Sequence, residues 1–128
     1  MSSLYWLMKS TDDIIRQIKD GTLREDASVE LKRWPPNKDI LAKVLVGLAN
    51  AGDGHLIIGI EESAKGIKAV GLKEGEDAAI RMVEAVCKEF SIHINTNIKK
   101  INVKGNDFLI VEIHPLNAVT YYSRSSSP

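Results

Sequence analysis

Residues 49–62 read ANAGDGHLIIGIEE, and this stretch decides the fold. Gly52 and Gly54 predict a turn, and the nearly uninterrupted apolar run over residues 55–60 is typical of a central strand covered on both faces. Two carboxylates, Glu61 and Glu62, follow it. A buried strand with acidic residues at its tip would hold those charges at a defined point of the fold.

Amphipathic patterns on either side of this strand predict three helices, at residues 11–19, 38–50 and 77–90. Residues 28–33 alternate between apolar and polar, as a half-buried strand does. Further strands are predicted at residues 67–72, 92–103, 108–113 and 118–122, with a hairpin turn at residues 105–106 or 106–107. The order predicts an α/β (α+β) fold: a single layered domain with a mixed β-sheet of about five to six strands and about three helices.

The composition is that of one globular domain. At 128 residues and 14.1 kDa the chain supports one hydrophobic core, so we expect one domain over residues 1–128, with a flexible polar tail at residues 123–128. Seventeen basic residues balance seventeen acidic ones, so nucleic-acid binding would have to come from a local patch. No apolar stretch is long enough to predict a membrane span, and the lone Cys87 fits a reducing compartment; we therefore expect a cytoplasmic protein.

Four segments together resemble a known domain family: Glu25-x-x-x-Val29-Glu30-Leu31-Lys32, then LANAGDG at residues 48–54, LIIGIEE at residues 56–62 and VGL at residues 70–72. They are similar to the Schlafen-type AlbA-like domain. Its members usually show an ESxx(V/I)EFK strand, an FANTxGG helix end and an IGVDD strand end. Residues 121–127 also look like a loose version of the family's aromatic-x-Arg and Gly-Ser-Ser-Thr ending.

The chain departs from the family pattern at a few motif positions. Leu31 replaces Phe, Asp26 replaces Ser, Asp53 replaces the first Gly of a pair, and Glu61 and Glu62 replace two aspartates. Asp tolerates the backbone conformation of a turn, so the turn should survive. The longer acids would shift any bound metal, which affects catalysis more than fold.

The resemblance implies a nucleic-acid-binding domain, with RNA favoured over DNA. The alternative that it implies is an endoribonuclease, dependent on Mg²⁺ or Mn²⁺, that cleaves structured RNA such as tRNA. Mapped by motif, the three acids of the nuclease members fall on Glu25, Glu30 and Glu62, which would act as catalytic residues and metal ligands, with Lys32 near the scissile phosphate. Carboxylate oxygens are the ligands that such hard cations prefer.

The residues themselves leave the site open. Glu25 and Glu30 are five positions apart, so in a straight strand they would point to opposite faces, and they converge only if the chain bends between them. Residues 26–28 are suited to such a bend. The alternative is that these acids are solvated surface residues. His55 and His93 lie in apolar strands, where a hydrogen-bonded structural histidine is more frequent than a ligand or base, and we leave both out of the site together with His114.

Cations and aromatic residues near these acids make up the predicted nucleic-acid-binding set: Lys32, Arg33, Tyr121, Tyr122 and Arg124. Trp34 follows Arg33, but packing against the sheet is the better interpretation for it. No Gly-x-x-x-x-Gly-Lys-(Ser/Thr) loop is present, so the sequence supports no ATP site of that type. A third class of function is a protein-interaction or oligomerisation module, which zero net charge and a possible open sheet edge would suit.

Overall fold

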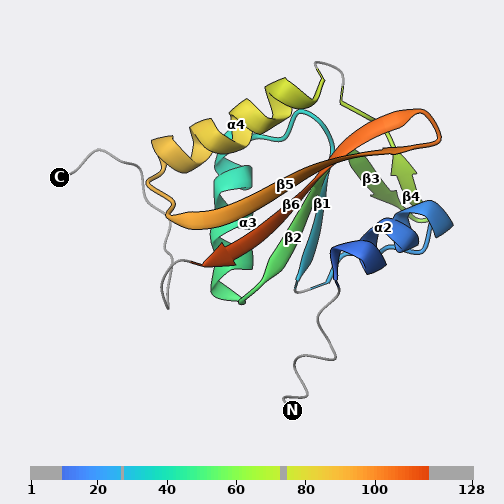
Figure 1. Ribbon diagram of the computed structural model, residues 1–128, viewed down its shortest axis with the longest axis horizontal. Helices are drawn as coiled ribbons and strands as arrows, with labels where there is room; N and C mark the ends of the chain where they lie inside the picture. The colour runs from blue at the N-terminus through green and yellow to red at the C-terminus, as the bar shows by residue number, and fades with distance from the viewer. Residues whose placement is uncertain (1–9, 27, 73–74, 116–128) are drawn as a thin grey trace, which may run out of the picture.

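The structure, a computed structural model, describes residues 10–26, 28–72 and 75–115. Within these residues it contains three helices and six strands (Figure 1). In chain order the elements are α2 (Thr11–Asp20), β1 (Val29–Lys32), α3 (Lys38–Asn50), β2 (Gly54–Ile58), β3 (Ile60–Ser63), β4 (Gly66–Ala69), α4 (Glu76–Glu89), β5 (Ile94–Val103) and β6 (Asn106–Pro115).

The strands form one mixed sheet of four strands and one small sheet of two. The larger sheet has the order β1-β2-β6-β5, in which β1 and β2 are parallel and the other neighbours antiparallel. β3 and β4 form a separate antiparallel hairpin. The predicted α+β class, with its mixed sheet and three helices, is confirmed.

Helices cover both faces of the larger sheet (Figure 1). On one face α3 and α4 pack against side chains such as Leu56, Leu109 and Val111. On the other face α2 and the β3–β4 hairpin pack against residues that include Ile57 and Phe108. β2 and β6 are therefore buried on both sides, as the apolar run over residues 55–60 predicts.

Two helices begin at side-chain caps, Ser10 and Asn37, which are residue types that favour a helix N-cap. The Ser10 hydroxyl accepts the backbone N–H of Asp13 at 3.1 Å, and the Asn37 side-chain oxygen accepts those of Asp39 and Ile40 at 2.9 and 3.1 Å. These bonds satisfy donors that a helix N-terminus leaves unpaired. The pattern of α3 misleads at one position, because Ile40, which helical spacing places on the buried stripe, is 49% exposed.

Gly59 divides the predicted central strand in two. Its φ of 108° ends β2, and its carbonyl accepts the backbone N–H groups of Val70 and Gly71 at 2.8 and 3.0 Å. Glu61 and Glu62 therefore lie inside β3 of the hairpin and not at the tip of the central strand, which corrects the prediction. The apolar run on both sides of Gly59 favours one continuous strand, and a lone glycine within it does not tell a break from a bulge or a close backbone contact.

The β5–β6 turn lies one residue earlier than predicted. Its central residues are Lys104 and Gly105, both with positive φ (53° and 84°), the conformation that suits a tight hairpin. Sequence reasoning missed it because lysine rarely adopts a positive φ. The predicted strand at residues 118–122 and the tail at residues 123–128 lie outside the described residues. No helix in the described ranges has the length and apolar character that a membrane span requires.

Candidate functional site

The chain reverses direction just before β1. Asp26 and Val29 exchange two backbone hydrogen bonds, at 3.1 and 3.3 Å, and Ser28 donates both its N–H and its hydroxyl to the Asp26 carboxylate at 2.8 and 3.0 Å. The reversal brings Glu25 back alongside β1, where its Oε1 accepts the N–H of Leu31 at 3.3 Å. The bend that the sequence requires for Glu25 and Glu30 to approach each other is thus present.

The break at Gly59 brings a second acid to the same place. β3 leaves the end of β2 beside β1, and Glu62 Oε2 accepts the backbone N–H of Glu25 at 3.3 Å. Glu61 points to the other side of the hairpin and pairs with Arg33 at 3.1 Å. Glu62, and not Glu61, therefore lies beside Glu25.

A cation completes the group. Lys32 Nζ lies 3.2 Å from Glu30 Oε1, and each of these side chains is 26% exposed. Both residues project from β1 on the same face, two positions apart. We call Glu25, Glu30, Lys32 and Glu62 the acidic junction; the four predicted site residues meet where β1, β3 and the segment before β1 come together.

The acidic junction carries unbalanced negative charge. Partial burial raises the pKa of Glu25, the charge of Glu30 raises it further, and that of Glu62 adds a smaller effect in the same direction. The Leu31 N–H and the Lys32 ammonium group act in the opposite direction without cancelling these effects. Three carboxylates with one neighbouring ammonium group favour the approach of a further cation.

The acidic junction does not fit a metal ion in the arrangement that the structure shows. Glu25 and Glu62 each accept a backbone N–H, and Glu30 is paired with Lys32. Across residues 10–26, 28–72 and 75–115, no three His, Cys, Asp or Glu side chains form a group that could hold a metal. The catalytic and metal-binding roles of Glu25, Glu30 and Glu62, and the role of Lys32 at a phosphate, stay predictions.

The predicted nucleic-acid-binding residues are only partly described. Lys32 and Arg33 lie next to each other at the end of β1, and each is paired with a glutamate. Tyr121, Tyr122 and Arg124 lie outside the described residues. Trp34 is buried in the core formed with α3 and α4, as the packing interpretation predicts.

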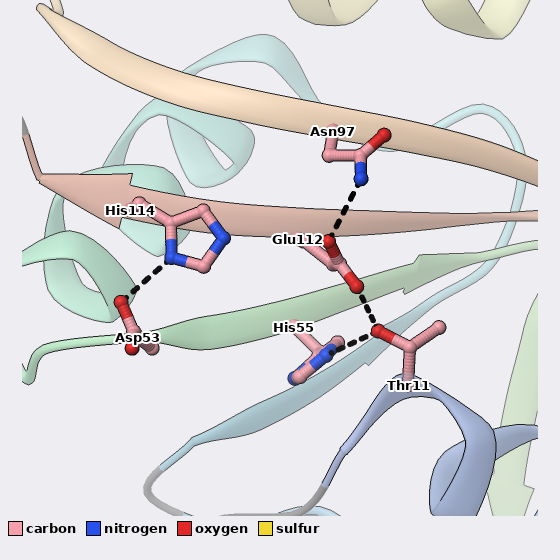
Figure 2. A network of polar contacts seen from close by, with 6 residues as sticks. All are labelled: Thr11, Asp53, His55, Asn97, Glu112 and His114. Atoms are coloured by element: carbon pink, nitrogen blue, oxygen red, sulfur yellow. Dashed lines mark hydrogen bonds and ion pairs between the residues drawn. The ribbon is translucent and has the colours of Figure 1, made fainter.

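A second polar group lies on the α2 side of the sheet (Figure 2). Thr11, the first residue of α2, donates its hydroxyl to Glu112 Oε2 and lies 3.0 Å from Nε2 of the buried His55. Asn97 donates to Glu112 Oε1 at 3.0 Å. Beside it, His114 Nδ1 lies 2.6 Å from the Asp53 carboxylate. We call Thr11, His55, Asn97 and Glu112 the polar network.

The polar network has a defined pattern of donors. The single hydroxyl proton of Thr11 goes to Glu112, so the His55 Nε2–H must donate to the Thr11 oxygen. Burial lowers the pKa of His55, and the hydrogen bond from Thr11 lowers the pKa of Glu112. His55 is thus the hydrogen-bonded structural histidine that its apolar strand predicts. Glu112 and Thr11 were not predicted as its partners; the one signal was an acid within an otherwise apolar strand.

Comparison with known families matches residues 25–127 to the model described as Schlafen, AlbA_2. The chain belongs to this family. The match begins at Glu25, so it covers the whole acidic junction but not α2. Among curated proteins no match was found.

Solved structures show the same fold as this Schlafen AlbA_2 chain. One is the N-terminal domain of a Nitrosomonas europaea protein related to the ATP-dependent DNA helicase RecG, with 21% identity and a TM-score of 0.66; the alignment covers 94% of this chain and 85% of that one. Another is a Corynebacterium diphtheriae protein, with 21% identity and a TM-score of 0.50; the alignment covers 81% of this chain and 24% of that one.

Proposed function

We propose that this Schlafen AlbA_2 chain is a nucleic-acid-binding domain that favours RNA over DNA. The observation that carries the proposal is the pair of cations Lys32 and Arg33 at the end of β1, in and next to the acidic junction, where family motif residues up to 37 positions apart meet. The helicase-related protein with the same fold is consistent with a domain that works on nucleic acid. A reducing, cytoplasmic location fits the single cysteine.

The proposed binding relies on exchange of ion-pair partners. Lys32 and Arg33 are both held by glutamates, so a phosphate would have to displace Glu30 or Glu61. Zero net charge supplies no long-range attraction to assist this exchange. We therefore expect modest affinity that falls steeply as salt concentration rises.

The test is a fluorescence anisotropy titration of a labelled RNA stem-loop and a DNA duplex of matching sequence, repeated between about 50 and 200 mM salt. We expect the RNA to bind more tightly, and Lys32→Ala and Arg33→Ala each to reduce the salt slope by about one. Arg124→Ala should weaken binding similarly, while Lys88→Ala, an exposed lysine of α4, is the matched control. Absent or salt-independent binding would reject the proposal.

The second candidate is a Mg²⁺- or Mn²⁺-dependent endoribonuclease acting on structured RNA such as tRNA. The raised pKa of Glu25 supports it, because carboxylates that repel one another are typical of sites that need a cation. For this function Glu30 would have to leave Lys32, and Glu25 and Glu62 would have to leave their backbone donors. The structure describes no such rearrangement, so we derive no reaction step from it.

Two measurements test this candidate. Mn²⁺ added to ¹⁵N-labelled protein should broaden the amide signals of residues around the acidic junction first, and Glu30→Gln should abolish that effect. Incubation with tRNA and Mn²⁺ should give cleavage that Glu30→Ala removes. Uniform broadening, or cleavage that survives Glu30→Ala, would exclude the junction as a nuclease site.

The third candidate is an oligomerisation module. β5 is an edge strand of ten residues, and such an edge can pair with a second chain. Its exposed lysines, among them Lys99 and Lys100, act against self-association. Light scattering that shows a defined oligomer, together with no affinity for nucleic acid, would favour this function over the first.

A further inference from the structure

A cavity of about 230 Å³ lies between the end of α2, the β3–β4 hairpin and the β5–β6 turn. Its floor is apolar and includes Ile18, Ile60 and Val103, all of them buried. A cavity of about 150 Å³ is enough to hold a benzene ring, whereas drug-sized ligands need about 300 Å³ or more. The cavity therefore has room for a single ring system.

The end of α2 borders the cavity and has backbone carbonyls that need hydrogen-bond donors. The last four carbonyls of a helix have no partner within the helix. The cap N–H groups of Gly21 and Thr22 bond to the carbonyls of Ile18 and Gln17 at 3.1 and 2.9 Å. This leaves the carbonyls of Lys19 and Asp20 without an intrahelical donor, and both residues line the cavity. A ring that carries N–H groups would match these acceptors.

The rim also carries positive charge. Lys19 and Lys104 line the cavity, and neither forms an ion pair within the part of the chain that the structure describes. Asp20 is the one carboxylate among the described lining residues, so the rim has a net positive charge. An anionic group attached to the ring would form ion pairs with the ammonium groups of Lys19 and Lys104.

The cavity adjoins the acidic junction. In β3, Ile60 lines the cavity and Glu62 belongs to the acidic junction. The two residues are two positions apart, so their side chains share one face of the hairpin and are separated by about 7 Å along the strand. Ile67, which pairs with Glu62 across the hairpin, also lines the cavity. A polymer bound at the junction would thus reach the cavity with a neighbouring unit.

We propose that this cavity binds one unpaired nucleobase together with its phosphate, the base against the apolar floor and the carbonyls of α2, and the phosphate on Lys104 and Lys19. A flat ring with N–H donors and an attached anion describes a nucleotide. If the bound base belongs to a polynucleotide, the inference rests on the proposed function. A free mononucleotide would present the same chemistry to the cavity. Bases outside a duplex are the usual targets of RNA recognition.

The experiment is a titration of ¹⁵N-labelled protein, followed by NMR, with nucleoside monophosphates, the matching nucleosides and inorganic phosphate. We expect amide shifts at Gly21, Ala69 and Val103 with the monophosphates. Ala69→Leu fills the cavity from β4 and should weaken monophosphate binding at least tenfold, whereas Ala85→Leu, on the exposed side of α4, should not. Lys104→Asn keeps a residue that tolerates positive φ and should weaken binding of the monophosphate but not of the nucleoside.

A parallel titration with a single-stranded oligonucleotide separates the two proposals. If Ala69→Leu weakens both ligands, the cavity serves the polymer; if only the monophosphate binds, the cavity stands and the proposed function falls. If the oligonucleotide binds through Lys32 while monophosphates cause no shifts and Ala69→Leu has no effect, the cavity proposal is overturned alone. If neither ligand binds, both proposals are wrong. Lys104→Asn gives an independent answer should Ala69→Leu not fold.

Discussion

At the scale of single residues, the surroundings of His55 favour its neutral ring. It is 8% exposed and lies between Thr11 at the positive end of α2 and Glu112 on the neighbouring strand, with Asp26, Asp53 and His114 also acting on it. Burial is the largest influence and disfavours the charged ring. The consequence is a dependence of stability on pH.

We predict that stability falls as pH drops below about 6.5, the ordinary pKa of histidine. The unfolded chain takes up a proton at His55 there while the folded chain, with its lowered pKa, does not, so the slope from this residue is at most about 1.4 kcal/mol per pH unit. Glu112, whose pKa is also lowered, removes further stability at more acidic pH. Urea unfolding between pH 8 and 5 measures the contribution of His55, and extending it to pH 4 reaches that of Glu112.

His55→Gln is the informative variant, because its amide can still donate to Thr11 but does not titrate. It should flatten the pH dependence between pH 7 and 5.5. His93→Gln, at an exposed histidine, is the control and should leave the slope as it is. An unchanged slope in His55→Gln would contradict the prediction.

The contribution of Glu25 to stability changes with pH in the opposite direction to that of His55. Its raised pKa means that the folded state favours the protonated carboxyl, so this stability is present below about pH 4.3 and is lost as pH rises through the raised pKa. At pH 7, Glu25→Gln keeps an acceptor for Leu31 and removes the repulsion with Glu30. Because the side chain is exposed, we expect a gain of at most about 1 kcal/mol.

Glu25→Ala separates the two roles of this residue. It removes the charge and also the acceptor for the Leu31 N–H, so it should be less stable than Glu25→Gln by about 1 kcal/mol. Unfolding by urea at pH 7 compares the variants. Equal stability of the two would mean that the hydrogen bond to Leu31 contributes nothing.

At the element scale, the sequence predicted helices better than the strand ends. Ser10 and Asn37 marked helix starts because their side chains bond locally to the backbone, and that chemistry is visible in the sequence. Gly59 did not reveal the break between β2 and β3, because the break involves hydrogen bonds from residues 70–71, and the room denied to a Cβ depends on the distant Phe108. Local patterns carry no information on such distant partners.

The break at Gly59 can be tested directly. A Cβ there would lie 3.0 Å from the Phe108 Cβ, and φ is 108°, so Gly59→Ala should cost about 2–3 kcal/mol. Gly47→Ala is the matched control: it lies within α3 with no atom near its added Cβ and should stabilise the helix by about 0.5–1 kcal/mol. Thermal unfolding measures both. A tolerated Gly59→Ala would mean that β2 and β3 can form one continuous strand.

At the scale of the whole molecule, the site illustrates the limit of sequence reasoning. The sequence identified Glu25, Glu30, Lys32 and Glu62 and stated that a bend was required, but their meeting depends on the reversal at Asp26 and on a hairpin that leaves the main sheet. The cavity beside them was not predicted at all. Its walls come from three segments distant in sequence, and of its described lining residues only Ile60 belongs to one of the family motifs.

The contribution of the α2 segment to the stability of the whole domain can be tested by removing it. Ile14, Ile18 and Leu23 belong to the core on its side of the sheet, and burying three such side chains is worth about 5–9 kcal/mol. That is comparable with the whole stability of an ordinary domain, about 5–15 kcal/mol. We predict that a chain beginning at residue 25 exposes apolar surface and binds a hydrophobic dye, whereas one beginning at residue 10 folds. A cooperative unfolding transition in the shorter chain would contradict this.

The position of α2 also bears on how such domains are inherited. The segment that matches the family model begins at residue 25, yet the polar network and one of the two core clusters tie residues 10–24 to it. The segment that matches the family model is therefore shorter than the structure it belongs to, because α2 lies outside it. A gene fusion that carried only the recognisable part would have to supply another helix in place of α2.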